Sequence, residues 1–207
     1  MKRLLSSLTL ALVAALTLAG CGGKDDSTSS TSSATNSSSS DFNDADVTFA
    51  QSMIPHHQQA VQMAKMAKTN ASSPEVKQLA EKIEAAQGPE IDTMTGWLKD
   101  WGKKAPSGSM SDMGGMNHDS DDDMGSMGSG DMPGMMSGAD MKKMMGASGA
   151  GFDSMFLTMM TEHHTGAIKM ARTEQANGKS ADAVALAEKV EADQTAEIAQ
   201  MKQLLKS

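Results

Sequence analysis

The sequence predicts an all-α protein whose folded part is a four-helix bundle built from two duplicated αα-hairpins. Shifting the chain by 107 residues aligns residues 46–98 with residues 153–205 without a gap and gives 21 identities in 53 aligned positions. Such self-similarity indicates an internal duplication. The aligned segments are amphipathic, and the whole chain contains no tyrosine and only 3% aromatic residues. Because strand-like runs are absent, each copy predicts two helices.

Each copy contains signals for where its helices begin and end. In the first copy we expect helices over residues 43–68 and 74–101, separated by the polar stretch "TNASSP". Ser73 precedes the second of these helices and is of a type that caps helix N-termini. In the second copy the stretch "ANGKSAD" provides Gly178 to end one helix and Ser180 to cap the next.

Residues 1–20 have the pattern of a bacterial lipoprotein signal peptide. A basic start is followed by an apolar run and then by "LAGC", which ends at Cys21. The run is shorter than the roughly 20 apolar residues that a membrane-spanning helix needs. We therefore expect cleavage before Cys21 and a lipid on its sulfur that anchors the mature protein to the membrane. Residues 21–40 are rich in serine and predict a flexible tether.

The composition restricts the partners of the chain. Cys21 is the only cysteine, so no disulfide can form within the chain, and this residue is not expected to bind metal. The formal net charge is −8, from 18 basic and 26 acidic residues, which disfavours nucleic acid and favours cations. We expect an extracytoplasmic, membrane-anchored protein with a metal ion as its partner. A copper-transfer partner protein and a homo-oligomer are both compatible with the sequence.

The bundle domain is expected to span residues 41–207, with repeat one at residues 41–102 and repeat two at residues 151–207. The segment between them, residues 103–150, is rich in Met, Gly and Asp and predicts a largely disordered loop. Eleven of the 21 methionines of the chain fall between positions 110 and 145. Packing cannot explain these methionines, because Gly and Asp separate them too thoroughly to build a core.

The central loop also predicts auxiliary metal ligands. Flexible thioethers with an imidazole nearby can wrap a Cu(I) or Ag(I) ion without a preformed pocket. Met113, Met116 and His118 combine these groups within six residues of sequence. Low-complexity drift is the alternative explanation for this composition.

Two related stretches, one in each copy, carry the residues that indicate metal chemistry. They are "MIPHHQQAVQMA", residues 53–64, and "MTEHHTGAIKMA", residues 160–171. In each stretch a methionine precedes a histidine pair by one helical turn, so the three side chains form a triangle on the apolar face of the helix. A further methionine follows along the same helix. The predicted metal ligands are Met53, His56, His57, Met63, Met160, His163, His164 and Met170.

Four imidazoles in an alanine-lined interior need partners, since an unpaired buried polar group costs about 1 to 3 kcal/mol. A bound metal ion would be such a partner. Imidazole suits copper, zinc, iron and nickel, whereas thioether sulfur selects soft ions, so the mixed set favours copper and Cu(I) in particular. Cu(II), silver and zinc are also compatible. The alternative is a purely structural network that the duplication has copied.

One glutamate falls inside the apolar stripe of the second helix in each copy, Glu90 in the first and Glu197 in the second. Because a glutamate on a core face is seldom left unpaired, we expect Glu90 and Glu197 to accept hydrogen bonds from the histidines and fix their tautomers. Direct binding of the metal by these carboxylates is the alternative. Pro55 lies within the first histidine helix and should kink it, whereas Glu162 stands at this position in the second, so the two halves cannot be fully equivalent.

The paired signatures "FAQSMIPHHQQAVQMA" and "FLTMMTEHHTGAIKMA", each followed by "QxxEIxxM", resemble the bacterial family known as domain of unknown function 305. The resemblance covers residues 41–207 apart from the central loop. It implies a ferritin-like four-helix bundle, and the family includes secreted copper-binding proteins of the CopM type. It also implies metal-binding roles for the eight His and Met residues of the two motifs.

The expected function is to buffer, sequester or hand on copper outside the cytoplasm, without catalysis. A ferritin-like metal-dependent oxidase is one alternative, but its di-iron form needs two Glu-x-x-His motifs that this sequence lacks. A second alternative is an oxidant sink, in which exposed methionines reversibly form sulfoxides. A third is a structural module in which the histidines only bridge helices.

Overall fold

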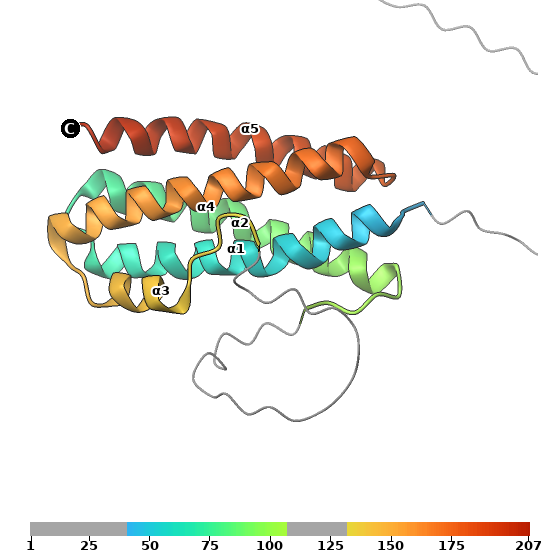
Figure 1. Ribbon diagram of the computed structural model, residues 1–207, viewed down its shortest axis with the longest axis horizontal. Helices are drawn as coiled ribbons and strands as arrows, with labels where there is room; N and C mark the ends of the chain where they lie inside the picture. Colours follow the sequence, from blue (N-terminus) through green and yellow to red (C-terminus); the bar gives the residue numbers. More distant parts are fainter. Residues whose placement is uncertain (1–40, 107–131) are drawn as a thin grey trace, which may run out of the picture. The chain divides into compact units, whose positions relative to one another are not determined.

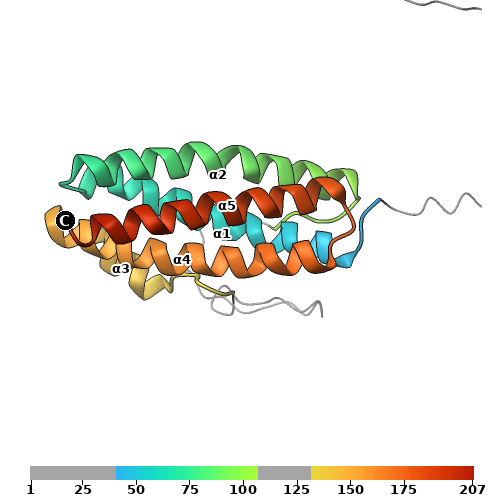
Figure 2. The same ribbon diagram turned by 90° about the horizontal axis from the view of Figure 1, so that it is seen from above.

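The computed structural model describes residues 41–106 and 132–207. Helices are the only regular secondary structure in these ranges, and two long hairpins, α1–α2 and α4–α5, lie side by side (Figures 1 and 2). This arrangement confirms the predicted all-α, four-helix architecture. No helix of the described ranges has the length and apolar character needed to cross a membrane. The helices are α1 (Asp44–Asn70), α2 (Pro74–Asp100), α3 (Gly138–Met145), α4 (Gly149–Asn177) and α5 (Ala181–Leu204).

The helices begin where capping residues satisfy the first backbone N–H groups. Asn43 starts α1 with a side chain that accepts two backbone N–H groups, and it forms a capping box with Asp46. Ser73 and Ser180 start α2 and α5 in the same way, each with one backbone N–H group. The second helix of each repeat therefore begins where its serine predicts.

The central pair of the bundle is formed by the helices that carry the histidine motifs. α1 packs against both α2 and α4, whereas α2 and α5 make much less contact with each other. The apolar interior is divided into two clusters. One cluster contains apolar side chains from residues 47–54 of α1 and 167–171 of α4. The other contains apolar side chains from residues 60–67 of α1 and 152–160 of α4. The histidine pairs lie between these two clusters on both helices.

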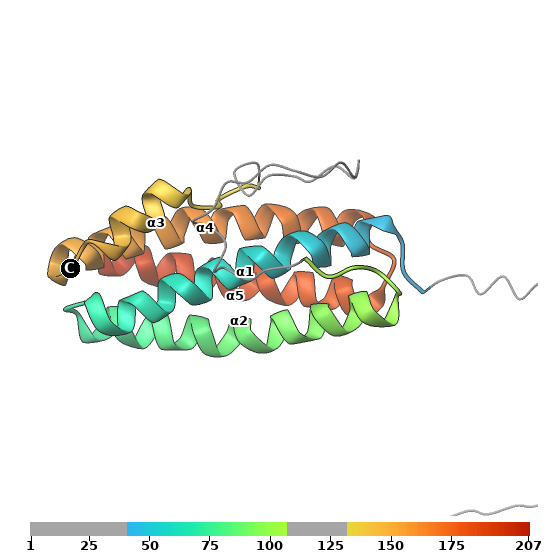
Figure 3. The same cartoon turned by 90° about the horizontal axis from the view of Figure 1, so that it is seen from below.

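Part of the segment that was expected to be a loop has an ordered place in the fold. Helix α3 lies outside the four long helices, beside the start of α4 (Figure 3), and buries Met141 and Met144. Residues 132–136, which we call the strap, precede α3 and make buried contacts with α1. Met136, Met141 and Met144 are buried in the apolar interior, so the expectation that packing explains none of the methionines of this segment is wrong for these three.

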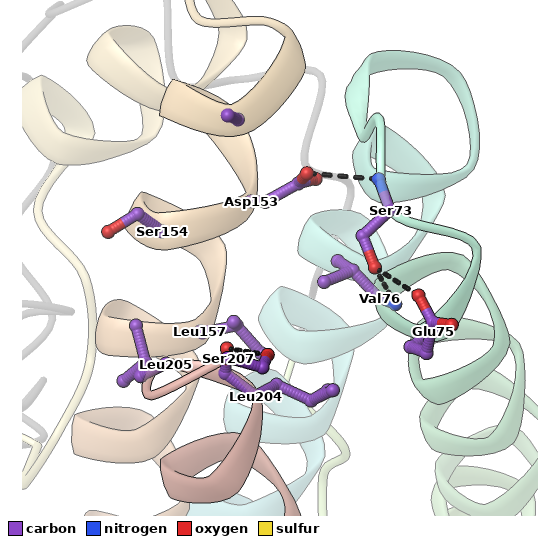
Figure 4. A pocket seen from close by; sticks show the side chains of 10 residues that line it. Ser73, Glu75, Val76, Asp153, Ser154, Leu157, Leu204, Leu205 and Ser207 are labelled. Carbon is purple, nitrogen blue, oxygen red and sulfur yellow. Dashed lines mark hydrogen bonds between the residues drawn. The ribbon is translucent and has the colours of Figure 1, made fainter.

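The two repeats hold each other's turns. Asp46 of α1 accepts hydrogen bonds from the backbone N–H groups of Lys179 and Ser180, at the turn of the second hairpin. Asp153 of α4 accepts from the backbone N–H groups of Ser72 and Ser73, both at 3.0 Å, at the turn of the first hairpin. Figure 4 shows the bond from Ser73. Asp153 and Ser73 also line a cleft of about 590 Å³ that contains none of the predicted metal ligands.

Candidate metal centre

The two halves of the bundle meet through one histidine from each repeat. The imidazole rings of His56 in α1 and His163 in α4 lie with their centroids 3.7 Å apart and their planes tilted by 37°. Both side chains are at most 1% exposed. Since the two residues occupy equivalent positions of the duplication, this contact lies where the repeats face each other.

The second histidine of each pair faces its own hairpin. Neighbouring residues on a helix are about 100° apart, so two adjacent histidines cannot both face the opposite repeat. His57 pairs through Nε2 with Oε2 of Glu90 in α2 at 2.9 Å, and His164 pairs through Nε2 with Oε2 of Glu197 in α5 at 2.7 Å. The structure thus contains the two hydrogen bonds that were expected of these glutamates.

The hydrogen bonds leave a free nitrogen on each ring. A carboxylate or a carbonyl oxygen can only accept, so Nε2 carries the proton in His57, in His164 and in His56, whose Nε2 lies 3.1 Å from the carbonyl oxygen of Pro133. The Nδ1 atoms of these three rings, and both ring nitrogens of His163, have no hydrogen-bond partner within the described residues. Nitrogen lone pairs without a proton are what a metal ion requires of imidazole.

The environment keeps the central histidines neutral. Burial, followed by the charge of His57, lowers the pKa of His56 to about 3. Burial, followed by the neighbouring His56, lowers the pKa of His163 well below its usual value. At neutral pH both rings are therefore uncharged, and protons do not compete with a metal ion for their lone pairs.

The predicted methionine ligands are divided between the two sides of the histidine layer. Met53 of the first motif belongs to one apolar cluster, and Met170 of the second motif packs against that cluster. Met63 and Met160 belong to the other cluster. Met53, Met63 and Met160 are fully buried, whereas Met170 is partly exposed and lines a cleft of about 440 Å³. Each side of the layer thus receives thioether sulfur from both repeats.

The carboxylate of Glu90 joins three helices. It accepts from His57 in α1 and forms an ion pair with Lys189 of α5, whose Nζ lies 2.9 Å from Oε1. Burial opposes ionisation of Glu90, but the hydrogen bonds from His57 and Lys189 hold its pKa below the usual value. Lys189 also pairs with Asp193 on its own helix. The histidine layer is therefore linked to charges at the surface on the α2–α5 side.

Several polar groups near this layer lie outside the predicted ligand set. Gln87 and Gln194 occupy equivalent positions of the two repeats, are buried, and have side-chain oxygens without a partner in the described ranges. The sequence does contain a signal for these glutamines, because both lie at equivalent positions inside the apolar stripes of α2 and α5. The strap residue Pro133 was missed, because it lies between the repeats and belongs to no recognisable motif.

The residues present fit a soft metal ion better than a hard one. The described residues contain no group of three or more His, Cys, Asp or Glu side chains placed so that they could hold a metal by themselves. Imidazole nitrogens are nevertheless unpaired in the layer, and the buried side chains on either side of it include thioethers. A metal ion bound by these imidazoles would need thioether sulfur to complete its coordination, and soft ions such as Cu(I) prefer this ligand. Cys21, Met113, Met116 and His118 lie outside the described residues.

Comparison with known proteins places the chain in a family. The family model described as "Domain of unknown function (DUF305)" matches residues 46–205, which include both histidine motifs and their partner glutamates. The chain belongs to the DUF305 family. This membership confirms the resemblance that the two motifs indicate. A search of curated proteins found no match.

Solved DUF305 structures have the same fold. A DUF305 protein from Streptomyces coelicolor that is described as secreted is 33% identical, covering 78% of this chain and 92% of its own, with a TM-score of 0.65. A DUF305 fragment from Deinococcus radiodurans is 24% identical, covering 79% of this chain and 97% of its own, also with a TM-score of 0.65.

A third similar structure is that of CopM in the Cu(II)-bound form. It is 32% identical, covering 78% of this chain and 95% of its own, with a TM-score of 0.61. CopM has also been solved in Cu(I)-bound, Ag-bound and apo forms, which match this chain with 28 to 30% identity.

Proposed function

We propose that this protein is an extracytoplasmic copper-binding lipoprotein that buffers, sequesters or hands on copper. Unpaired imidazole nitrogens in the buried layer carry the proposal, since three independent hydrogen bonds orient these rings with Nδ1 free. The solved structures of CopM with Cu(II), Cu(I) and silver support it from a relative about 30% identical to this chain.

Cu(I) is the oxidation state that the donor set favours. His56 and His163 supply neutral nitrogen, and the buried methionines supply thioether sulfur, which selects soft ions. Cu(II) and zinc would bind mainly through nitrogen and carboxylate oxygen. We therefore expect Cu(I) and Ag(I) to bind more tightly than Zn(II).

The segments outside the bundle support an extracytoplasmic, membrane-anchored location for the protein. Residues 1–20 and Cys21 have the lipoprotein pattern, and a lipid on this cysteine would anchor the mature protein at the outer side of the membrane. The Met-rich segment with Met113, Met116 and His118 would collect copper weakly, and the histidine layer would hold it more firmly. We propose that copper reaches the histidine layer past Met170, which is partly exposed and lines a cleft of about 440 Å³.

The experiment that tests this proposal is an anaerobic titration of the full chain with Cu(I), Cu(II) and Zn(II). The protein carries Cys21→Ser, so that it is not lipidated and has no free thiol that could bind metal. A second protein also lacks residues 107–131. Tight Cu(I) binding that survives the deletion supports a principal site in the bundle. Copper that is lost with the deletion, or Zn(II) bound as tightly as Cu(I), would contradict the proposal.

A further inference from the structure

The strap is fastened to α1 by one buried side chain. The Nε2 amide of Gln59 donates to the carbonyl oxygen of Met136 at 2.9 Å, and the backbone N–H of Met136 donates to Oε1 of Gln59 at 2.7 Å. Gln59 is only 1% exposed. A buried amide whose donor and acceptor both pair with one backbone unit fixes the position of that unit, because either group would be costly to leave unpaired.

The strap also lies directly on the backbone of α4. Gly134 has a φ of 77°, in the left-handed region that favours glycine, and a Cβ there would come within 2.6 Å of the Glu162 carbonyl oxygen. A Cβ on Gly166 of α4 would overlap the carbonyl group of Pro133. Both glycines are therefore required for this close approach. It leaves the Pro133 carbonyl oxygen 3.1 Å from Nε2 of His56.

The duplication differs between its copies at the point where the strap crosses. Gln59 and Gly166 are 107 residues apart and occupy equivalent positions of the two repeats. The strap is a single segment with one direction, so it cannot contact two symmetry-related helices in the same way. In the first repeat Gln59 forms two hydrogen bonds with the strap, and in the second repeat Gly166 has no side chain that would collide with it.

The strap makes the two central histidines unequal. His56 donates its Nε2 proton to the Pro133 carbonyl group of the strap and presents Nδ1, whereas the ring nitrogens of His163 have no partner in the strap. The strap thus fixes the tautomer of one ring before a metal arrives and leaves the other ring unfixed. The strap also covers the residues around His163 from outside, since Gly134 packs against the backbone of Glu162 and His163.

We propose that Gln59 and Gly166 are positioning residues of the copper site. They hold the strap so that the Pro133 carbonyl group fixes the tautomer of His56, and the held strap slows the release of copper from the histidine layer. The part that concerns copper rests on the proposed function. The part that concerns the tautomer of His56 is independent of any metal.

The metal-free protein tests the positioning role. Nitrogen NMR spectra distinguish the two tautomers of histidine, and amide exchange reports the opening of the Met136 N–H. In Gln59→Ala and Gln59→Leu, which remove both hydrogen bonds, we expect faster exchange at Met136 and a mixture of His56 tautomers. Gly166→Ala should give the same result from the opposite side of the strap. Gln58→Ala, at the neighbouring and partly exposed position, is the matched control.

The loaded protein tests the exchange role. Cu(I) is bound anaerobically in the Cys21→Ser protein, and its transfer to an excess of a chromogenic chelator is followed with time. We expect release to be at least about tenfold faster in both Gln59 variants and in Gly166→Ala, the size typical of losing an outer partner of a metal-ligating histidine. Gln58→Ala should release copper at the rate of the parent protein.

The outcomes separate the two proposals. Unchanged release rates in variants that melt at lower temperature would make the strap purely structural and overturn the exchange role. An unchanged His56 tautomer and Met136 exchange would overturn the positioning role. If the parent protein binds no Cu(I), the proposed function fails together with the exchange role, and the NMR result still decides the positioning role.

Discussion

Asp46 and Asp153 are equivalent residues of the two repeats, and each accepts hydrogen bonds from the hairpin turn of the other repeat. Asp46 holds the backbone at Lys179 and Ser180, and Asp153 holds the backbone at Ser72 and Ser73. These bonds lie at opposite ends of the central helix pair and fix how far α1 can slide along α4. That register is what brings His56 against His163.

Loss of the Asp153 cap should destabilise the protein. Asp153→Asn replaces one accepting oxygen by an NH₂ group that faces backbone donors, so we expect the free energy of unfolding to fall by about 1 to 3 kcal/mol. Chemical denaturation at pH 7 measures the change. Ser154→Ala, at the exposed neighbouring position, should change it by less than about 0.5 kcal/mol. Equal stability of the two variants would show that the cross-repeat bonds contribute little.

The glutamate partners should tune the affinity of the histidines for copper. Glu197→Gln keeps an oxygen that can accept from His164 but removes the negative charge that strengthens this hydrogen bond. We expect Cu(I) affinity to fall about tenfold. Competition with a Cu(I) chelator measures it, and Glu188→Gln on the exposed face of α5 is the control. If both variants bind alike while only Glu197→Gln melts earlier, the carboxylate acts on the fold alone.

Replacing thioethers by leucine should separate packing from ligation. Met53→Leu and Met160→Leu are volume-conserving changes at fully buried positions, so each should alter the free energy of unfolding by less than about 1.5 kcal/mol. We expect both to weaken Cu(I) binding much more than Cu(II) binding, because only the soft ion prefers sulfur. Met94→Leu in α2, equally buried but outside the motifs, is the control. If all three variants bind Cu(I) with equal affinity, the methionines of the motifs contribute to packing and do not bind the metal.

A buried pair of carboxyl groups should make stability fall as the pH rises from about 4.5 to about 8. Burial, together with the neighbouring carboxyl group of Asp46, raises the pKa of Glu174 to about 8, above the ordinary value of 4.5. The folded protein therefore holds a proton that the unfolded chain has lost, so stability is full below about pH 4.5 and is lost as the pH rises to about 8. Glu174 is 1% exposed, and the expected loss is on the order of a few kcal/mol.

The variant Glu174→Gln tests this pH dependence. An amide keeps a donor for Asp46 and cannot ionise, so the variant should be more stable than the parent at pH 9 and should lose the slope between pH 5 and pH 8. Unfolding is measured by chemical denaturation at each pH. Glu162→Gln, on the exposed face of the same helix, should keep the slope of the parent. A parent protein whose stability does not change over this range would refute the raised pKa.

The helices of the bundle could be predicted because their signals are local. The helix expected over residues 74–101 is observed as Pro74–Asp100, since Ser73 caps it and its apolar stripe is continuous. The internal duplication then predicts the second hairpin from the first. Glu90 and Glu197 were found in the same way, because a carboxylate inside an apolar stripe requires a partner.

The parts of the site that depend on contacts between distant segments could not be predicted. The sequence places Met53, His56 and His57 on one face, but the packing of α1 sends His56 toward the opposite repeat and His57 toward its own hairpin. The strap has no periodicity and binds side chains 77 residues away in sequence. The sequence contains one sign of the strap, which is that the position equivalent to Gln59 in the second repeat is a glycine, Gly166.

The most direct test of the account is to count the tightly held copper in a protein that lacks the central histidine contact. The variant combines His56→Ala and His163→Ala in the Cys21→Ser background and is loaded with Cu(I) without oxygen, desalted and analysed for metal, beside a His118→Ala control. The account predicts that the double variant remains folded by circular dichroism and loses the copper that the control retains. Copper content equal to that of the control, with only the melting temperature changed, would contradict a metal centre at the meeting point of the two repeats.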